Sequence, residues 1–132
     1  MPVKCGQLVT ESTLVTNDLV NCPGDGLVIG ADRIILDLNG HTIDGVALGT
    51  GVRNAGFASV TIRNGTIEDF DRGVELLEET QLGVVTDLVV RHNEVAGIEL
   101  FDAVQQGIER NLGLDLNGRH KSFIVNRIRI SP

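Results

Sequence analysis

Apolar and polar positions repeat along this chain in three eight-residue segments that align without a gap. Each segment has apolar residues at its first, third and last positions, and a polar stretch rich in Asn, Gly and His separates the last two. The segments are Leu36 to Ile43, Val60 to Ile67 and Leu88 to Val95, and the second offset is slightly longer than the first. A repeat of this length predicts a stack of similar coils. It directs the search for function to the outer surface of that stack.

Glycine marks the start of each expected coil. The four opening glycines recur at nearly equal spacing, and each precedes an apolar residue: Gly26, Gly51, Gly73 and Gly97. Glycine at a recurring corner permits backbone angles that other residues avoid. Apolar residues also alternate as strands require, with expected inward positions at Ile34, Leu36, Leu38, Val60, Ile62, Leu88 and Val90. We expect these side chains to form apolar ladders between coils.

The pattern predicts an all-β solenoid of about four to five coils in a single domain over residues 1–132. Residues 1–25 would cap the N-terminal end, and residues 26–121 would form the coils. Residues 122–132 would form a last strand that caps the stack or pairs with another chain. Because open strand edges invite pairing, we expect a homo-oligomer formed through the coil ends.

Two other folds stay open at this point. A β-sandwich is built from hairpins with tight turns, and Asn39-Gly40 and Asn64-Gly65 are dipeptides that favour such turns. A βαβ fold needs amphipathic helices of about ten residues or more between its strands. Only residues 73–82 and 101–112 could supply them, and neither segment is strongly periodic.

Composition narrows the classes of partner. The chain has 11 Lys and Arg against 18 Asp and Glu, a formal charge of -7, which argues against a nucleic-acid partner. It has no Trp or Tyr and four Phe, so base-stacking platforms and an aromatic sugar cleft are both disfavoured. No apolar run approaches the roughly 20 residues that cross a bilayer, and residues 1–4 are followed at once by polar residues rather than by a signal-peptide pattern. We therefore expect no membrane partner.

Cys5 and Cys22 are the only cysteines, and they do not form a CxxC pair. A four-ligand zinc site would need other donors, and none cluster nearby. The two thiols are either free or joined in a disulfide that closes the N-terminal segment. We favour the disulfide, which would stabilise the fold by about 3 kcal/mol and would suit an oxidising compartment.

Two stretches carry a family resemblance, GLVIGADRIILDLNGHTIDG from Gly26 and GVRNAGFASVTIRNGTIEDFDRGVEL from Gly51. They resemble the right-handed parallel β-helix repeat family, the pectate-lyase-like superfamily with its carbohydrate-binding and sugar-hydrolase module. The stretch from Cys5 to the turn at residues 22–26 looks like the opening of the same proteins. The resemblance covers roughly residues 5–100, as in a short or truncated member. It implies a right-handed helix, an extracytoplasmic location, and polysaccharide binding along an outer face.

The resemblance also says where chemistry would lie. Its lyases use carboxylates that hold calcium and an arginine base, and its hydrolases use paired carboxylates. Equivalent outward positions of the repeat place Arg63 beside Arg91. The expected ligand-binding set is Arg63, Arg91, Asn64, His41 and His92, which could hold an acidic sugar or another anion. The alternative is a solvated turn with an asparagine ladder, in which the arginines pair with Glu68 or Glu94.

An acidic run next to Phe70 is the second candidate. Glu68, Asp69 and Asp71 could belong to a calcium site or to an exposed loop between coils. Calcium takes about six to eight oxygen ligands, and the spacing of the run is looser than that of a strong calcium loop. The sequence therefore requires no cofactor and leaves calcium as the one candidate.

The sequence as a whole predicts a non-catalytic structural or saccharide-binding module. The alternative is a polysaccharide lyase or glycoside hydrolase acting along the outer face of the stack. In that case, the residues to test first are Arg63, Arg91, His92 and Glu94.

Overall fold

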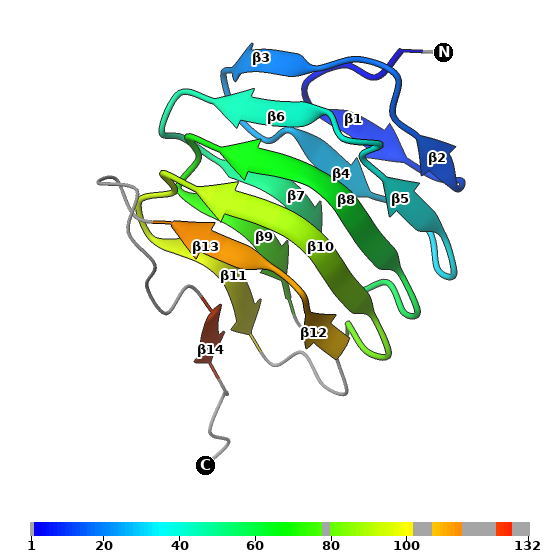
Figure 1. The fold of residues 1–132 in the computed structure, drawn as a ribbon. Coiled ribbons are helices and arrows are strands. Elements are labelled where there is room, and N and C mark those ends of the chain that lie inside the picture. Colours follow the sequence, from blue (N-terminus) through cyan, green and yellow to red (C-terminus); the bar gives the residue numbers. More distant parts are fainter. Residues whose placement is uncertain (1, 78–79, 102–106, 115–123, 128–132) are drawn as a thin grey trace.

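The computed structural model describes residues 2–77, 80–101, 107–114 and 124–127, and these residues form fourteen strands and no helix (Figure 1). Most strands are short and are separated by bends, as the frequent turn residues predict. In chain order the strands are β1 (Gln7–Val9), β2 (Thr13–Leu14), β3 (Leu19–Cys22), β4 (Leu27–Ile29), β5 (Ile35–Asp37), β6 (Thr42–Gly45), β7 (Thr50–Asn54), β8 (Thr61–Glu68), β9 (Arg72–Leu76), β10 (Val84–Arg91), β11 (Ala96–Phe101), β12 (Gly107–Glu109), β13 (Leu112–Leu114) and β14 (Ile124–Arg127).

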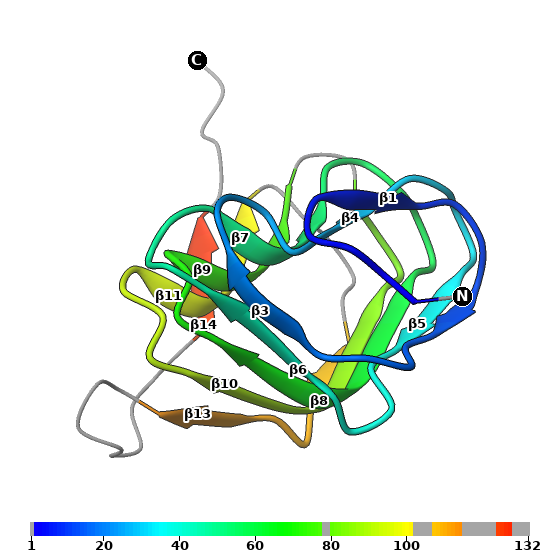
Figure 2. The same ribbon diagram turned by 90° about the horizontal axis from the view of Figure 1, so that it is seen from above.

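The strands stack into two parallel sheets that wind around one core. One sheet has the order β1-β4-β7-β9-β11-β14, and the other runs β12-β10-β8-β5-β2, with β13 beside β10 and β6 between β3 and β8. Viewed from the N-terminal end, the chain turns clockwise as it recedes, which is right-handed (Figure 2). The protein is a right-handed parallel β-helix of about four turns. The parallel pairing excludes the β-sandwich, and the described residues contain none of the helices that a βαβ fold requires.

The glycine spacing correctly predicts the register of β4, β7, β9 and β11 in the first sheet. Leu27 lies opposite Val52, Val52 opposite Val74, and Val74 opposite Ile98. The reason for glycine is close approach rather than an unusual φ. A Cβ on Gly26 would lie 2.4 Å from the carbonyl oxygen of Gly51, and a Cβ on Gly51 would lie 2.6 Å from that of Gly73. Only glycine allows neighbouring coils to come this close.

The eight-residue alignment is correct in part. Ile43 lies opposite Ile67 as expected, but Leu36 lies opposite Ile62 rather than Val60. The third segment is shifted by five positions, because Val90 rather than Val95 lies opposite Ile67. The offset between β8 and β10 is therefore shorter than the aligned segments predict.

The difference between the predicted and the observed register arises at corners. There, single residues adopt left-handed backbone angles and change which of the following residues point inward. Eleven non-glycine residues of the described chain have positive φ. Ten recur at three corners: Arg33, Ser59 and Leu82 at the first, Asn39, Asn64, Asp87 and Arg110 at the second, and Ala47, Asp69 and His92 at the third. The other, Asn21, lies where the register of β3 with β6 shifts. In β10, the corner at Asp87 separates the buried apolar residues Val85 and Leu88 by three positions instead of two.

All seven expected inward residues are buried. They pack in one continuous core, and the largest fully buried side chain is that of Phe70. Each coil thus buries its apolar face on its neighbours, as the repeat predicts.

The N-terminal residues lie across the top of the stack. Cys5 and Cys22 form a disulfide. Val3 is buried in the core, and its backbone exchanges two hydrogen bonds of 2.9 and 3.1 Å with the side-chain amide of Asn17. These contacts hold the first residues over the open end of the first coil.

Part of the C-terminal strand expected at residues 122–132 is described. β14 pairs in parallel with β11 and so extends the first sheet by one coil. The rest of the expected last strand lies outside the described residues.

Candidate functional site

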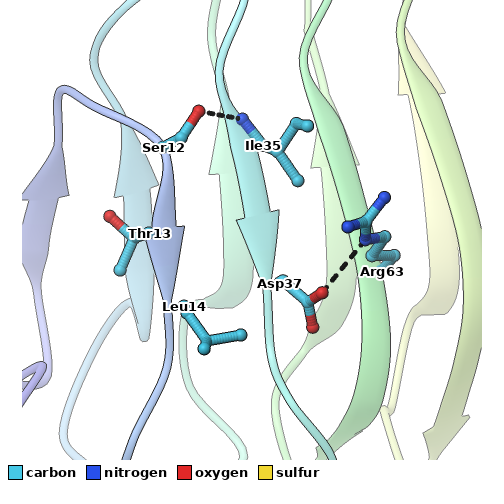
Figure 3. Close-up of a pocket in the computed structure, with 6 residues that line it drawn as sticks. All are labelled: Ser12, Thr13, Leu14, Ile35, Asp37 and Arg63. Carbon is cyan, nitrogen blue, oxygen red and sulfur yellow. Dashed lines mark hydrogen bonds and ion pairs between the residues drawn. The ribbon is translucent and has the colours of Figure 1, made fainter.

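An open groove lies on the outer face of the second sheet, across β2, β5 and β8 (Figure 3). Its volume is about 280 Å³. The residues that line it are Ser12, Thr13, Leu14, Ile35, Asp37 and Arg63. A groove of this size could hold about one or two sugar rings.

The strand register brings three of these residues into one row. Leu14 lies opposite Asp37, and Asp37 lies opposite Arg63. Because side chains alternate along a strand, the preceding residues Leu36 and Ile62 point inward and are buried. The row Leu14–Asp37–Arg63 therefore points outward on three successive coils.

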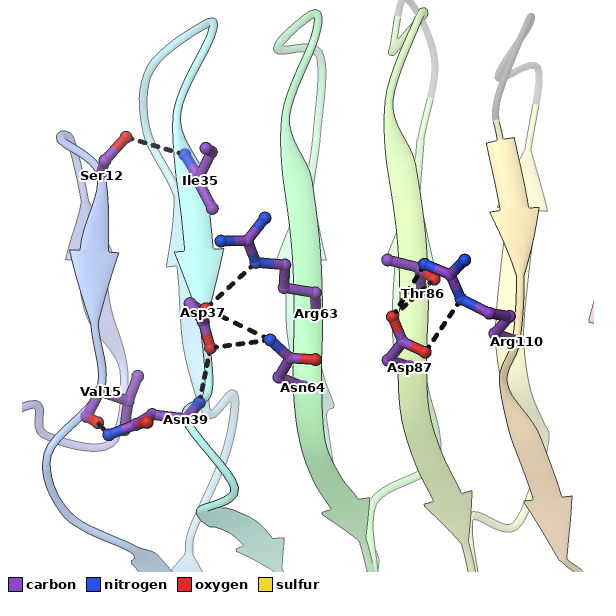
Figure 4. Close-up of polar contacts among 10 residues, drawn as sticks. All are labelled: Ser12, Val15, Ile35, Asp37, Asn39, Arg63, Asn64, Thr86, Asp87 and Arg110. Carbon is purple, nitrogen blue, oxygen red and sulfur yellow. Dashed lines mark hydrogen bonds and ion pairs between the residues drawn. The ribbon is translucent and has the colours of Figure 1, made fainter.

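Asp37 is a well-held carboxylate at the end of the groove. It accepts hydrogen bonds from the backbone N–H of Asn39 at 2.8 Å and from Arg63 Nε at 3.1 Å, and longer contacts of 3.3 and 3.4 Å from Asn64 (Figure 4). Partial burial alone would raise the pKa of this carboxyl, but the hydrogen bonds outweigh burial and lower its pKa below the usual value. Asp37 is therefore ionised at neutral pH.

Arg63 keeps its two terminal nitrogens available. Only its Nε is bonded, and within the described part of the chain its terminal nitrogens have no hydrogen-bond partner. They point away from Asp37, toward Ile35 (Figure 4). By contrast, Arg91 uses Nε and a terminal nitrogen on Glu68, at 2.8 and 2.7 Å. Arg63 is thus the arginine that can donate to a ligand in the groove.

The structure does not bring the predicted ligand-binding set together. Arg91 lies opposite Glu68, five positions along β8 from Arg63, a separation of about 16 Å along the strand. The expectation that the two arginines stack is wrong, because it rests on the longer offset of the third aligned segment. Arg91 makes the ion pair with Glu68 that the solvated-turn alternative contains.

The two histidines of that set lie apart as well. His41 Nδ1 contacts Asp18 Oδ1 at 2.9 Å, and His92 Nδ1 lies 3.9 Å from Asp69 Oδ1 at the third corner. Asn64 is the one other member beside Arg63, since both contact Asp37.

The residues named for catalysis are divided in the same way. Arg91, His92 and Glu94 lie at the third corner, at the end of β10 and just after it, whereas Arg63 lies on the face before the second corner. The neighbouring Asn93 is buried and supports the backbone, because its Oδ1 accepts the N–H of Phe70 at 3.0 Å. The four residues named for catalysis therefore do not form one site.

Three carboxylates meet at the third corner. Asp44, Glu68 and Asp69 each place an oxygen within 4.8 Å of the others. Asp71, which the sequence suggests as the third member, is not among them. The cluster could offer three oxygen ligands to a cation, whereas calcium prefers about six to eight. The pKa of Asp69 is raised to about 6. Burial is the largest cause, followed by a hydrogen bond shared with Asp44 and by the negative charges of Asp44 and Glu68.

We expect Asp69→Asn to stabilise the protein at pH 8 and to lose this effect in acid. A folded-state pKa above the usual 3.8 means that wild-type stability increases as the pH falls through about 6 toward 3.8. The variant removes the repulsion, and Asn tolerates the left-handed φ of this residue. Because Asp69 is partly exposed, we expect a melting temperature only about 2–4 °C higher at pH 8. Thermal unfolding at pH 8 and pH 4.5 measures the difference.

Asp71→Asn is the matched control, because Asp71 follows closely in the chain and lies outside the cluster. An equal gain at both pH values, or an equal gain in the control, would contradict the expectation. Repeating the pH 8 measurement with calcium chloride tests the calcium candidate, since a bound ion would stabilise the wild type and not Asp69→Asn.

Comparisons with protein-family models, with curated proteins and with solved structures found no match for this chain. The described residues include no helix long and apolar enough to cross a membrane.

Sequence reasoning misses most of the groove. Ser12, Thr13 and Leu14 fall in the segment expected to cap the stack, yet β2 is the first strand of the second sheet. The sequence does contain a signal for this part of the groove. Asp37 and Arg63 are separated by about one coil, which pairs an acidic and a basic side chain on adjacent coils.

Proposed function

We propose that this β-solenoid is a non-catalytic saccharide-binding module whose ligand lies in the groove across β2, β5 and β8. The observation that supports this best is that, within the described chain, the terminal nitrogens of Arg63 are free beside the apolar surface of the groove. The resemblance to polysaccharide-binding β-helix proteins supports the same ligand class. The disulfide supports residence in an oxidising compartment.

The groove combines the two kinds of surface that a sugar ring needs. Leu14 is 57% exposed and Ile35 is 40% exposed, so both can contact the C–H face of a ring. Arg63 and Asp37 supply a donor and an acceptor at one end. Ser12 Oγ accepts the N–H of Ile35 at 2.9 Å, which leaves its hydroxyl hydrogen to donate to a ligand.

The same geometry argues for binding without turnover. Glycoside hydrolases need two carboxyl groups about 5–9.5 Å apart on either side of the bond, and among the described residues Asp37 is the only carboxylate that lines the groove. Its lowered pKa makes it a poor proton donor. Arg63 donates its Nε–H to that carboxylate, and a guanidinium carries hydrogen-bond donors but no acceptor.

A binding experiment with matched controls tests the proposal. Leu14→Ala and Arg63→Ala should each weaken binding to a panel of neutral and acidic polysaccharides by about tenfold, or about 1.4 kcal/mol. Leu48→Ala controls for loss of an exposed leucine, because Leu48 is 56% exposed and lies outside the groove. Arg91→Ala controls for loss of an arginine, since both arginine side chains are 41% exposed. Absence of binding to every polysaccharide, or equal losses in the controls, would refute it.

The lyase or hydrolase alternative is measured in the same samples. A lyase should release unsaturated products when calcium is present, and a hydrolase should release reducing ends. Turnover that survives repurification and disappears in Arg63→Ala would replace the binding proposal with an enzymatic one.

We also propose self-association through the coil ends. Within the described sheets, β1 and β2 are outermost strands and β3 pairs only with β6, so the first coil keeps an open edge. Size-exclusion chromatography with light scattering should give a mass above one chain. A single-chain mass that does not change on dilution would rule the oligomer out.

A further inference from the structure

We infer that the groove selects neutral saccharides with adjacent hydroxyl groups over acidic ones. This inference rests on the proposed function and names its ligand class. It reverses the expectation, drawn from the stacked arginines, of a face for acidic sugars.

The charge of the groove is the first argument. In the described part of the chain, Arg63 is the only cationic residue that lines it, and Asp37 lies 3.1 Å from Arg63 Nε. The arginines on the neighbouring coils are already engaged, because Arg91 pairs with Glu68 and Arg110 with Asp87. The whole chain has a formal charge of -7. A polyanion would therefore meet a neutral groove on an acidic protein, with repulsion at long range.

The arrangement of donors and acceptors is the second argument. Two adjacent sugar hydroxyls can accept from a terminal nitrogen of Arg63 and donate to Asp37. A carboxylate has about four acceptor positions. Three donors already contact Asp37, namely the N–H of Asn39 at 2.8 Å, Arg63 Nε at 3.1 Å and Asn64 Nδ2 at 3.3 and 3.4 Å, so one position is left for a sugar hydroxyl. A ligand carboxylate could accept from Arg63 but could not donate to Asp37. It would place a second negative charge beside Asp37, which disfavours binding.

The third argument is the apolar part of the groove. Leu14 and Ile35 lie on adjacent coils and are both exposed. Their side chains suit the C–H face of a sugar ring and give no compensation for the desolvation of a charged group. A neutral sugar ring can contact the apolar side chains and hydrogen-bond to the Asp37–Arg63 pair at the same time.

Chemically matched polymers test the inference. The probes are polygalacturonate, alginate and glucuronoxylan, each compared with its carboxyl-reduced form, so that each pair differs only in whether the sugar carries a carboxylate or a neutral hydroxymethyl group. The wild type should bind at least one reduced polymer about tenfold more tightly than its acidic parent. This binding should change little between low and high salt, because no net charge is neutralised.

Asp37→Asn gives the sharpest variant. It removes the negative charge while keeping an oxygen that can accept the N–H of Asn39. Affinity for the acidic polymers should increase about tenfold, because their carboxylates would no longer lie beside a second negative charge. Asp87→Asn is the control, because Asp87 also pairs with an arginine, Arg110, and lies outside the set of residues that line the groove.

The outcomes separate the two proposals. Tighter, salt-sensitive binding of any acidic parent by the wild type would overturn the preference for neutral sugars and leave saccharide binding in place. An unchanged affinity of Asp37→Asn for the acidic polymers would overturn the role of Asp37. Absence of binding to all six polymers and to the wider panel would overturn the proposed function itself.

Discussion

Gly51→Ala is expected to lower the free energy of unfolding by more than about 3 kcal/mol. The new Cβ would lie 2.2 Å from Cγ2 of Ile67 and 2.6 Å from the carbonyl oxygen of Gly73. Cβ contacts shorter than 3.0 Å require something to move. The carbonyl belongs to the next coil, so the movement must separate two stacked strands rather than turn one flexible side chain.

The cost is large because the backbone of the coil cannot relax alone. Gly51 and Gly73 lie in one column, and each lacks a side chain at the point where the next coil comes closest. Separating the coils there would lengthen the ladder hydrogen bonds between β7 and β9 and open gaps around the fully buried Phe70. Loss of packing and loss of hydrogen bonds therefore add to the clash.

Gly24→Ala is the matched control. A Cβ on Gly24 has no heavy atom within 4 Å, and this residue does not have a left-handed φ. We expect its stability to stay within about 0.5 kcal/mol of the wild type. Equilibrium unfolding in guanidinium chloride measures both variants, and equal midpoints for Gly51→Ala and Gly24→Ala would show that the close approach is not required.

The column of glycines also shows how far the sequence determines the fold. The nearly equal spacing of Gly26, Gly51, Gly73 and Gly97 correctly predicts the register of β4, β7, β9 and β11, because a coil that must pass close to its neighbour can place glycine at only one position. Apolar content alone is less informative. Leu88 and Val90 are inward in both the predicted and the observed register, so the segment beginning at Leu88 fits an alignment that is wrong by five positions.

The corners explain why the alignment fails. A left-handed residue such as Asp87 turns the chain and changes which neighbours point inward, and Asn, Asp, Arg, His, Ser, Ala and Leu all occupy such corners here. No single residue type marks them among the described residues. The candidate site depends on the corners, since whether Arg63 lies beside Arg91 or beside Asp37 is decided by the register. The sequence therefore predicts Arg63 as a ligand residue and misses Leu14, Ile35 and Asp37.

Arg72→Met is expected to lower the free energy of unfolding by about 1.5–3 kcal/mol, the usual value of a hydrogen bond to a charged group. Arg72 Nε donates to the carboxylate of Glu99, a residue that is only 3% exposed, and lies 3.9 Å from Glu75. Glu75 and Glu99 are opposite residues on adjacent strands. Two like charges in this position repel each other. Removing the arginine would leave the two carboxylates side by side, with Glu99 buried from water.

Arg53→Met is the control on the same face. Arg53 is more exposed than Arg72 and lies 3.7 Å from Asp25 and 3.7 Å from Glu75, so its ion pairs are screened by solvent. We expect this variant to cost less than about 1 kcal/mol. The hydrogen bond from Arg72 to Glu99 raises the pKa of Arg72 above its usual value, so the guanidinium keeps its charge. Arg72→Lys keeps a positive charge but loses the planar guanidinium, so it tests the hydrogen-bond geometry separately from the charge.

The double variant Arg72→Met with Glu99→Met separates two contributions to stability. One is the cost of burying the Glu99 carboxylate once Arg72 is removed, and the other is the net contribution of the Arg72–Glu99 ion pair. Replacing a buried ion pair by apolar side chains is often neutral or stabilising, whereas removing one partner is not. We therefore expect the double variant to recover most of the stability that Arg72→Met loses, as measured by guanidinium chloride unfolding in one double-mutant cycle. Equal losses in the single and double variants would mean that Arg72 stabilises the stack through packing of its side chain rather than through the charge of Glu99.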